Sequence, residues 1–230
     1  MKTLSSILLV ISAFILDSCT TTKLLTSDVK PSEVVDLQYF EPFSNVSLMY
    51  EGNEKILNDS LSNESKQRLY EIVQEFKDKI SLTGTITVTS NTIKQRVEKD
   101  IENLVIAAND IKNSRISSIR TTPLIDSLLK SNNKRFGLIT VDSGYIKTNP
   151  LYTKQILASA SLNIILEALI FRYPSPTPHP NKAYSALYVI IVDADQGNLA
   201  FYRKTVISGS PTDKSVLRDQ FTEIFKDYYF

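Results

Sequence analysis

The chain has 230 residues, of which 42% are hydrophobic, and it carries 26 basic and 25 acidic side chains. This size and apolar content suffice for one globular domain with its own core. The net charge of +1 argues against a nucleic-acid-binding protein or a polybasic membrane-surface protein, because both need a concentrated basic footprint. With 1 cysteine in the sequence, a disulfide within one copy of the chain is excluded.

The N-terminal residues predict an export signal. Residues 1–3 contain a lysine, and residues 4–16 are uncharged and rich in Leu, Ile, Val and Phe. This apolar run has the length of a signal-peptide core and is shorter than the ~20 residues that a membrane-spanning helix needs.

Leu16-Asp17-Ser18-Cys19 follows this run and resembles the lipobox of bacterial lipoproteins, although Asp17 stands where that motif has a small residue. The resemblance implies cleavage between Ser18 and Cys19 and fatty-acyl chains, such as palmitate, on Cys19. Two or three such chains hold a protein persistently on a bilayer. Thr20, which is not Asp, implies sorting to the outer membrane with the domain facing the periplasm. A buried cysteine after an ordinary secretory signal, or an uncleaved anchor, remains the alternative.

Three segments are expected in the chain. Residues 1–18 form the lipoprotein signal peptide, residues 19–32 a flexible polar tether, and residues 33–230 a single globular α/β domain. The tether is inferred from the polar run that ends in Lys-Pro-Ser before the first apolar stretch.

The first half of the domain shows periodicities of both strands and helices. They predict strands over residues 34–43, 46–50 and 85–89 and helices over residues 63–80 and 92–112. Pro42 should end the first ladder because it lacks an N–H. Ser60 or Ser62 should cap the first helix, and Thr92 with Gln95 should form a capping box on the second.

The second half ends in a predicted β-hairpin over residues 185–207, with Gly197 in its turn, and a final helix that begins after Pro211. Before them, Thr122 and Pro123 should open a helix, and residues 136–141 should form a central strand ended by a turn at 142–144. Residues 151–171 are ambiguous between a buried helix, a segment that contacts the membrane or another subunit, and a hairpin.

Together these elements predict an α/β (α+β) fold with a mixed central sheet, a C-terminal β-hairpin, and helices packed on the sheet.

The sequence offers few candidate functional sites. His179 is the sole histidine, and the sequence lacks a Gly-x-Ser-x-Gly elbow and a Gly-rich phosphate loop, so we expect no catalytic residues, no metal and no cofactor. The motifs Asp59-Ser60-Leu61 and Asp126-Ser127-Leu128 make Ser60 and Ser127 candidate O-glycosylation sites, although helix capping explains the first equally well.

Two stretches of the domain resemble the periplasmic α/β domain of TolB N-termini and CsgG-type lipoproteins. They are residues 39–45 (YFEPFSN) and residues 187–202, which would be the paired strands before the last helix. The chain also resembles uncharacterised lipoproteins of this size in Gram-negative bacteria. The CsgG-type resemblance implies an oligomeric secretion-channel or pore subunit.

The sequence therefore favours a non-enzymatic envelope lipoprotein that binds or scaffolds other proteins. Its expected partners are the lipid bilayer, through acylated Cys19, and envelope proteins or further copies of the chain, but not nucleic acid. A pore subunit is the first alternative, and a hydrolase that uses Ser, Asp and His179 is the second.

Overall fold

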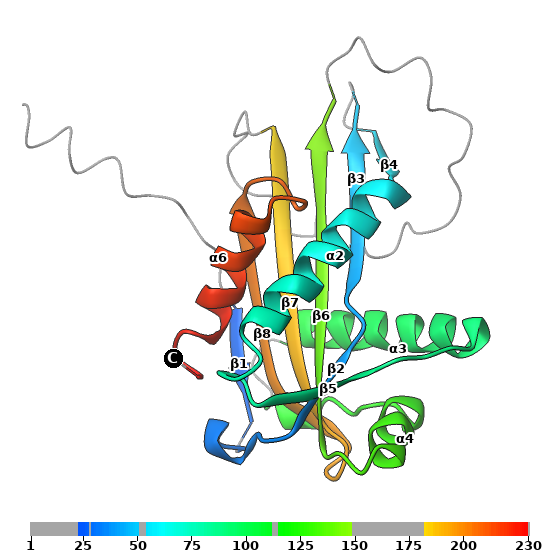
Figure 1. Cartoon of the computed structure of the whole chain (residues 1–230), viewed down its shortest axis with the longest axis vertical. Coiled ribbons are helices and arrows are strands. Elements are labelled where there is room, and N and C mark those ends of the chain that lie inside the picture. Colours follow the sequence, from blue (N-terminus) through cyan, green and yellow to red (C-terminus); the bar gives the residue numbers. More distant parts are fainter. Residues whose placement is uncertain (1–22, 28, 51–53, 112–114, 149–181, 230) are drawn as a thin grey trace, which may run out of the picture.

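The computed structural model describes residues 23–27, 29–50, 54–111, 115–148 and 182–229. In this part of the chain eight strands form one mixed sheet with helices on both faces, which confirms the predicted α/β fold class (Figure 1). The strands are β1 Lys23–Thr26, β2 Leu37–Phe40, β3 Phe43–Met49, β4 Lys55–Leu57, β5 Leu82–Ile86, β6 Phe136–Lys147, β7 Ala183–Asp193 and β8 Asn198–Ser208.

The long strand β6 lies inside the sheet. It pairs antiparallel with β7 on one side and parallel with β2 and then β3 on the other. The β7–β8 hairpin confirms the predicted one, and Gly197 in its turn has a φ of +59°. The sheet order β1-β8-β7-β6 continues to β2 and β5 at one end of β6 and to β3 and β4 at the other.

The predicted turn at residues 142–144 was wrong, because β6 runs straight through it. Polar residues are tolerated in mid-strand here because Asp142 and Ser143 both find hydrogen-bond partners inside the protein. The glycine at position 144 is explained by close packing, because a Cβ at this position would lie 2.2 Å from the Tyr184 carbonyl oxygen on β7. Its missing side chain therefore allows β6 and β7 to pair along their whole length.

The first predicted strand is divided in two. Asp36, with a φ of +55°, precedes β2, and Pro42 separates β2 from β3, as its missing N–H predicts. β2 turns its outer edge to β5, and β3 turns its outer edge to β4, a short strand that the periodicity did not predict.

The helices divide between the two faces of the sheet. α2 Asp59–Glu75 and α6 Lys214–Phe225 pack over one apolar core, and α3 Asn91–Asp110 and α4 Pro123–Ser131 cover the other (Figure 1). The strand residues of β7 are buried on both faces, as expected for a central strand.

Two of the three predicted helix caps were wrong. Asn58, not Ser60 or Ser62, caps α2 by accepting from the Leu61 N–H, and α3 begins after Ser90 without a side-chain cap. The cap at Thr122 is confirmed, since its hydroxyl accepts from the Ile125 N–H at 3.4 Å. Ser62 does not cap the helix, because its hydroxyl accepts from the Val46 N–H of β3.

The stretch expected to be a tether contains β1, which pairs antiparallel with β8 and continues the sheet at that edge. The lipobox, residues 151–171 and His179 lie outside the described residues, so the predictions for them stay predictions. Among the described helices, none combines the length and the hydropathy needed to cross a bilayer.

Candidate functional site

The outer edge of β3 is unpaired over part of its length in the described part of the chain. β5 follows β2 only as far as Phe40, and β4 joins β3 only from Ser47 onward. The outward Val46 N–H donates to the Ser62 hydroxyl at 2.9 Å, and the Val46 C=O accepts from the Asn58 N–H at 2.8 Å. Because backbone groups alternate along a strand, the N–H and C=O of Ser44 point the same way, where no described strand pairs with them.

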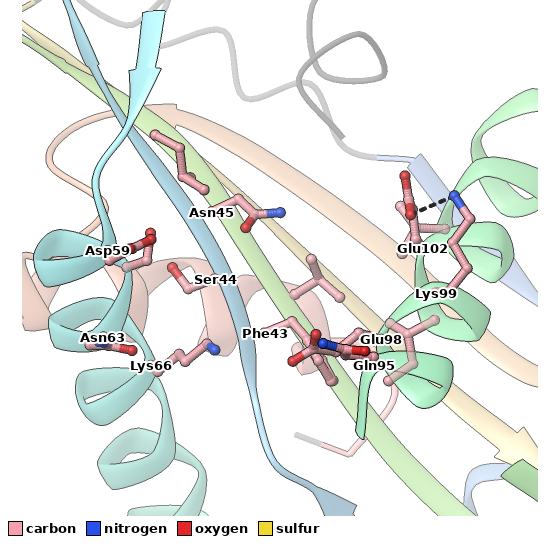
Figure 2. A pocket seen from close by; sticks show the side chains of 15 residues that line it. Phe43, Ser44, Asn45, Asp59, Asn63, Lys66, Gln95, Glu98, Lys99 and Glu102 are labelled. Atoms are coloured by element: carbon pink, nitrogen blue, oxygen red, sulfur yellow. Dashed lines mark hydrogen bonds and ion pairs between the residues drawn. The ribbon is translucent and has the colours of Figure 1, made fainter. Parts of the chain in front are cut away.

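A groove of about 570 Å³ runs along this open edge (Figure 2). Helix α2 forms one wall, helix α3 forms the other, and β3 lies between them. The wall residues are Asp59, Ser62, Asn63 and Lys66 from α2 and Gln95, Glu98, Lys99, Ile101, Glu102 and Val105 from α3.

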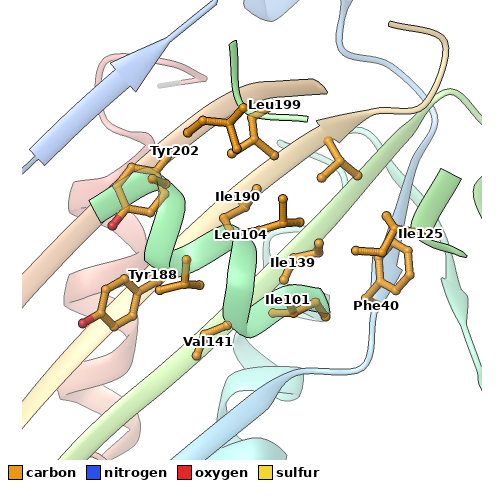
Figure 3. Close-up of a cluster of buried hydrophobic side chains, with 14 of the residues drawn as sticks. Phe40, Ile101, Leu104, Ile125, Ile139, Val141, Tyr188, Ile190, Leu199 and Tyr202 are labelled. Carbon is orange, nitrogen blue, oxygen red and sulfur yellow. The ribbon is translucent and has the colours of Figure 1, made fainter. Parts of the chain in front are cut away.

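The groove is apolar where helix α3 meets the sheet. Ile101 and Val141 are buried in the core between α3 and the sheet (Figure 3), and the Phe43 ring packs against the same core. An occupant on this side would therefore meet hydrocarbon near the sheet and charge near the rim.

Each wall of the groove carries a charged side chain without an ion-pair partner among the described residues. On α2, the Lys66 ammonium lies 5.9 Å from the centroid of the Phe43 ring, so this side chain points toward the open edge of β3 (Figure 2). On α3, Lys99 is paired with Glu102 at 2.9 Å, whereas Glu98 is not paired. Asp59 in the first turn of α2 also has no ion-pair partner among the described residues, so the α2 wall offers a carboxylate and a cation, and the α3 wall offers a carboxylate.

A buried carboxyl group lies behind the α2 wall. Asp142 on β6 is fully buried, and its carboxylate accepts from Ser65 at 2.6 Å, Ser185 at 3.1 Å and Ser44 at 3.5 Å. Burial raises the pKa of Asp142 to about 7, because a charge there loses water, and the hydroxyl donors offset only part of that loss. This cluster joins α2 to β3, β6 and β7.

Gln220 extends the cluster to α6. Its amide nitrogen donates to the Ser185 carbonyl at 3.1 Å, and its Oε1 lies 2.8 Å from the Ser185 hydroxyl. Both helices on this face are therefore tied to the sheet through one buried polar network.

The structure separates the predicted modification sites from each other. Ser60 is exposed in the first turn of α2, and Ser127 is exposed on α4, where its hydroxyl donates to the Leu124 carbonyl at 2.8 Å. They lie on opposite faces of the sheet, and O-glycosylation of either stays a prediction. Cys19 and Ser18 lie outside the described residues, as does His179. The described residues hold no cluster of three or more metal-ligating side chains.

Sequence reasoning missed Lys66, Ser44 and Asp142 as site residues. The available signal for Asp142 is an aspartate directly after the apolar run of β6, but Asp-Ser-Gly at this point is also typical of a turn. Nothing local marks Lys66 or Ser44, because the groove exists only where two neighbouring strands stop short.

The fold and the groove define a mixed α/β domain with a partly open sheet edge between two helices. No protein-family model and no curated protein sequence matches this chain. Among solved structures it is similar to the PelC dodecamer from Paraburkholderia phytofirmans, at a TM-score of 0.38 and 8% identity over 92% of this chain and 99% of that chain. It is also similar to the LpoB C-terminal domain from Salmonella enterica, at a TM-score of 0.31 and 11% identity over 80% and 88%. Similarity at this level leaves the function to be inferred from the chain's own geometry.

Proposed function

We propose that the chain is a cell-envelope lipoprotein that binds or scaffolds another envelope protein and catalyses no reaction. Acylated Cys19 would hold it on the outer membrane with the domain in the periplasm. The apolar residues 4–16 followed by Leu16-Asp17-Ser18-Cys19 support the anchor.

The open edge of β3 carries the proposal of a binding role. Proteins usually blunt or cover strand edges, because unpaired N–H and C=O groups recruit other chains. Here the edge lies at the bottom of a groove with the Lys66 ammonium on one wall and the Glu98 carboxylate on the other. An extended polypeptide can satisfy such an edge by joining the sheet as one more strand.

The position of Asp142 supports a structural role for this group. Its pKa is raised toward neutrality, as in many catalytic carboxyls. However, the residue has 0% exposure, and hydroxyls from α2, β3 and β7 surround its carboxylate. It is placed to hold the helices on the sheet, out of reach of a substrate.

Site-specific photo-crosslinking in cells tests the proposed function. A photoreactive phenylalanine analogue replaces Asn63 in the groove, and a matched variant carries it at Asp219, which is exposed on α6. We expect one defined envelope protein to crosslink from position 63 and not from position 219. Crosslinks at neither position, or the same background at both, would argue against a partner in this groove.

The resemblance to CsgG-type lipoproteins makes an oligomeric secretion-channel subunit the competing role. Light scattering on the Cys19→Ser full chain separates the two, because this variant cannot be acylated. A monomer at micromolar concentration supports the binding protein. A ring of many copies would instead favour the channel subunit.

A further inference from the structure

We propose that the groove binds an extended peptide segment of alternating charge, basic–acidic–basic, which pairs with β3 opposite Ser44. The inference rests on the proposed binding function and names the kind of partner that this groove fits. It follows from the free backbone groups, from the alternation of side chains along a strand, and from the charge on each wall.

The backbone fixes the register of the added strand. Pro42 has no N–H to donate, and the outward groups of Val46 are already bonded to Ser62 and Asn58. Ser44 lies between them, and no described residue bonds to its outward N–H or C=O. A segment that enters the groove can therefore make its pair of backbone hydrogen bonds at Ser44 and not one position further along.

The residue opposite Ser44 must point toward the α2 wall. Paired residues of neighbouring strands share a face of the sheet, and the Ser44 side chain lies on the α2 face, where its hydroxyl faces Asp142 at 3.5 Å. Two charged side chains on this wall have no ion-pair partner in the described chain, Asp59 in the first turn of α2 and Lys66, and the Lys66 ammonium is the one that lies near the Phe43 ring of β3. A carboxylate on the central residue of the peptide would pair with it.

The two flanking residues of the peptide point to the other wall, because successive side chains alternate between faces. That wall has the buried apolar side chains Ile101 and Val105, and one turn before Ile101 on α3 it carries Glu98, which has no ion-pair partner among the described residues. A lysine or arginine fits this profile, since its aliphatic stem covers apolar surface while its charged end reaches a carboxylate.

Lys66 also has a purely protective explanation. A lysine across an open strand edge discourages pairing with other copies of the chain. The two explanations differ in what reversal of the charge does: a recognition residue changes which peptide binds, whereas a protective residue changes only self-association.

The experiment uses two synthetic peptides and three forms of the full chain in detergent. The peptides are acetyl-Thr-Val-Lys-Glu-Lys-Val-Thr-amide and the same sequence with the central Glu replaced by Lys. The proteins are the natural chain, Lys66→Glu, and Lys77→Glu as a matched reversal at an exposed position outside the groove. Fluorescence anisotropy of labelled peptides gives the dissociation constants.

We expect the natural chain and Lys77→Glu to bind the Glu-centred peptide about fivefold more tightly than the Lys-centred one, the effect of one partly exposed ion pair. In Lys66→Glu the preference should reverse. No binding by the natural chain, or a preference that Lys66→Glu leaves unchanged, would overturn the proposal. It would equally be overturned if Lys66→Glu only raised the mass in light scattering, because the edge would then be guarded against other copies.

A second set of peptides, altered in the backbone, tests strand addition directly. N-methylation of one peptide amide at a time removes one donor without changing any charge. The amide that donates to the Ser44 carbonyl belongs to the central Glu if the peptide pairs antiparallel, and to the following Lys if it pairs parallel. We expect methylation at one of these two positions to weaken binding at least tenfold. A flat response to methylation would overturn strand pairing. If the peptides fail while position 63 still crosslinks to an envelope protein, only the peptide inference falls and the proposed function stands.

Discussion

At the scale of single residues, the hydrogen bonds around Asp142 depend on whether its carboxyl group is protonated. The Ser185 hydroxyl has a single hydrogen but lies between two acceptors, Gln220 Oε1 at 2.8 Å and Asp142 Oδ1 at 3.1 Å. When it donates to Gln220, a protonated Asp142 can donate back to the Ser185 oxygen, and every contact is satisfied. An ionised Asp142 leaves two acceptors competing for one hydrogen.

We therefore expect a pH-dependent stability that Asp142→Asn removes. The folded-state pKa of about 7 exceeds the unfolded value, so the stabilisation is complete below about pH 4 and is lost as pH rises toward 7. Its slope between those limits can reach about 1.4 kcal/mol per pH unit. Urea unfolding at pH 5, 6, 7 and 8 should show this fall in the natural chain and a flatter profile in Asp142→Asn. Parallel profiles for the two proteins would contradict the prediction.

A second prediction concerns the buried Asp193 at the end of β7. Arg135 binds both of its carboxylate oxygens, through Nε at 3.0 Å and Nη2 at 2.7 Å. Lysine keeps the charge but cannot make this two-point contact, so Arg135→Lys should lower the free energy of unfolding by about 1 kcal/mol. The control is Arg218→Lys, where the ion pair with Glu75 is exposed and the change should be close to zero. Equal losses in the two variants would show that the buried contact is not special.

At the scale of elements, the β6–β7 pairing depends on Gly144. An alanine Cβ there would meet the Tyr184 carbonyl oxygen at 2.2 Å, and only movement of the backbone could relieve that clash. Gly144→Ala should destabilise the fold by about 1–3 kcal/mol, the usual cost of overpacking. Gly84→Ala on β5 is the matched control, because its Cβ would meet the movable amide of Gln38 at 2.8 Å. Urea unfolding compares them, and a Gly144→Ala protein as stable as the control would refute the argument.

Elements with strong local signals were predicted well. The helix predicted to open at Thr122 and Pro123 is α4, which begins at Pro123 with Thr122 as its cap. Gly197 supplies the positive φ of the hairpin turn. Signals that need a distant partner failed. Asp142 looks like a turn residue until Ser65 and Ser185 surround it, and β4 is too short to show a period.

At the scale of the whole molecule, the fold class was predictable from apolar runs that need cover on both faces, as in β7. The groove was not predictable. It results from where β4 and β5 stop along β3 and β2, which is a relation between strands far apart in the sequence.

The proposed membrane anchor yields a prediction at this scale. Cys19→Ser should abolish incorporation of labelled palmitate in cells and move the protein from the membrane fraction to the soluble fraction, because the acyl chains supply the binding free energy. Since the sequence has 1 cysteine, no second thiol can take over the acylation in this variant. Membrane association that survives Cys19→Ser would point to a different attachment.

If Cys19 is acylated as proposed, the place of β1 in the sheet would set the orientation of the molecule on the membrane. β1 begins at Lys23, four residues after Cys19, and a chain of four residues spans at most about 14 Å. With lipid on Cys19, the edge of the sheet formed by β1 and β8 would lie close to the lipid headgroups. β3 lies on the opposite side of the sheet, beyond β7 and β6. This proposed attachment, at one border of the sheet, would leave the groove facing away from the membrane and open to molecules in the aqueous compartment.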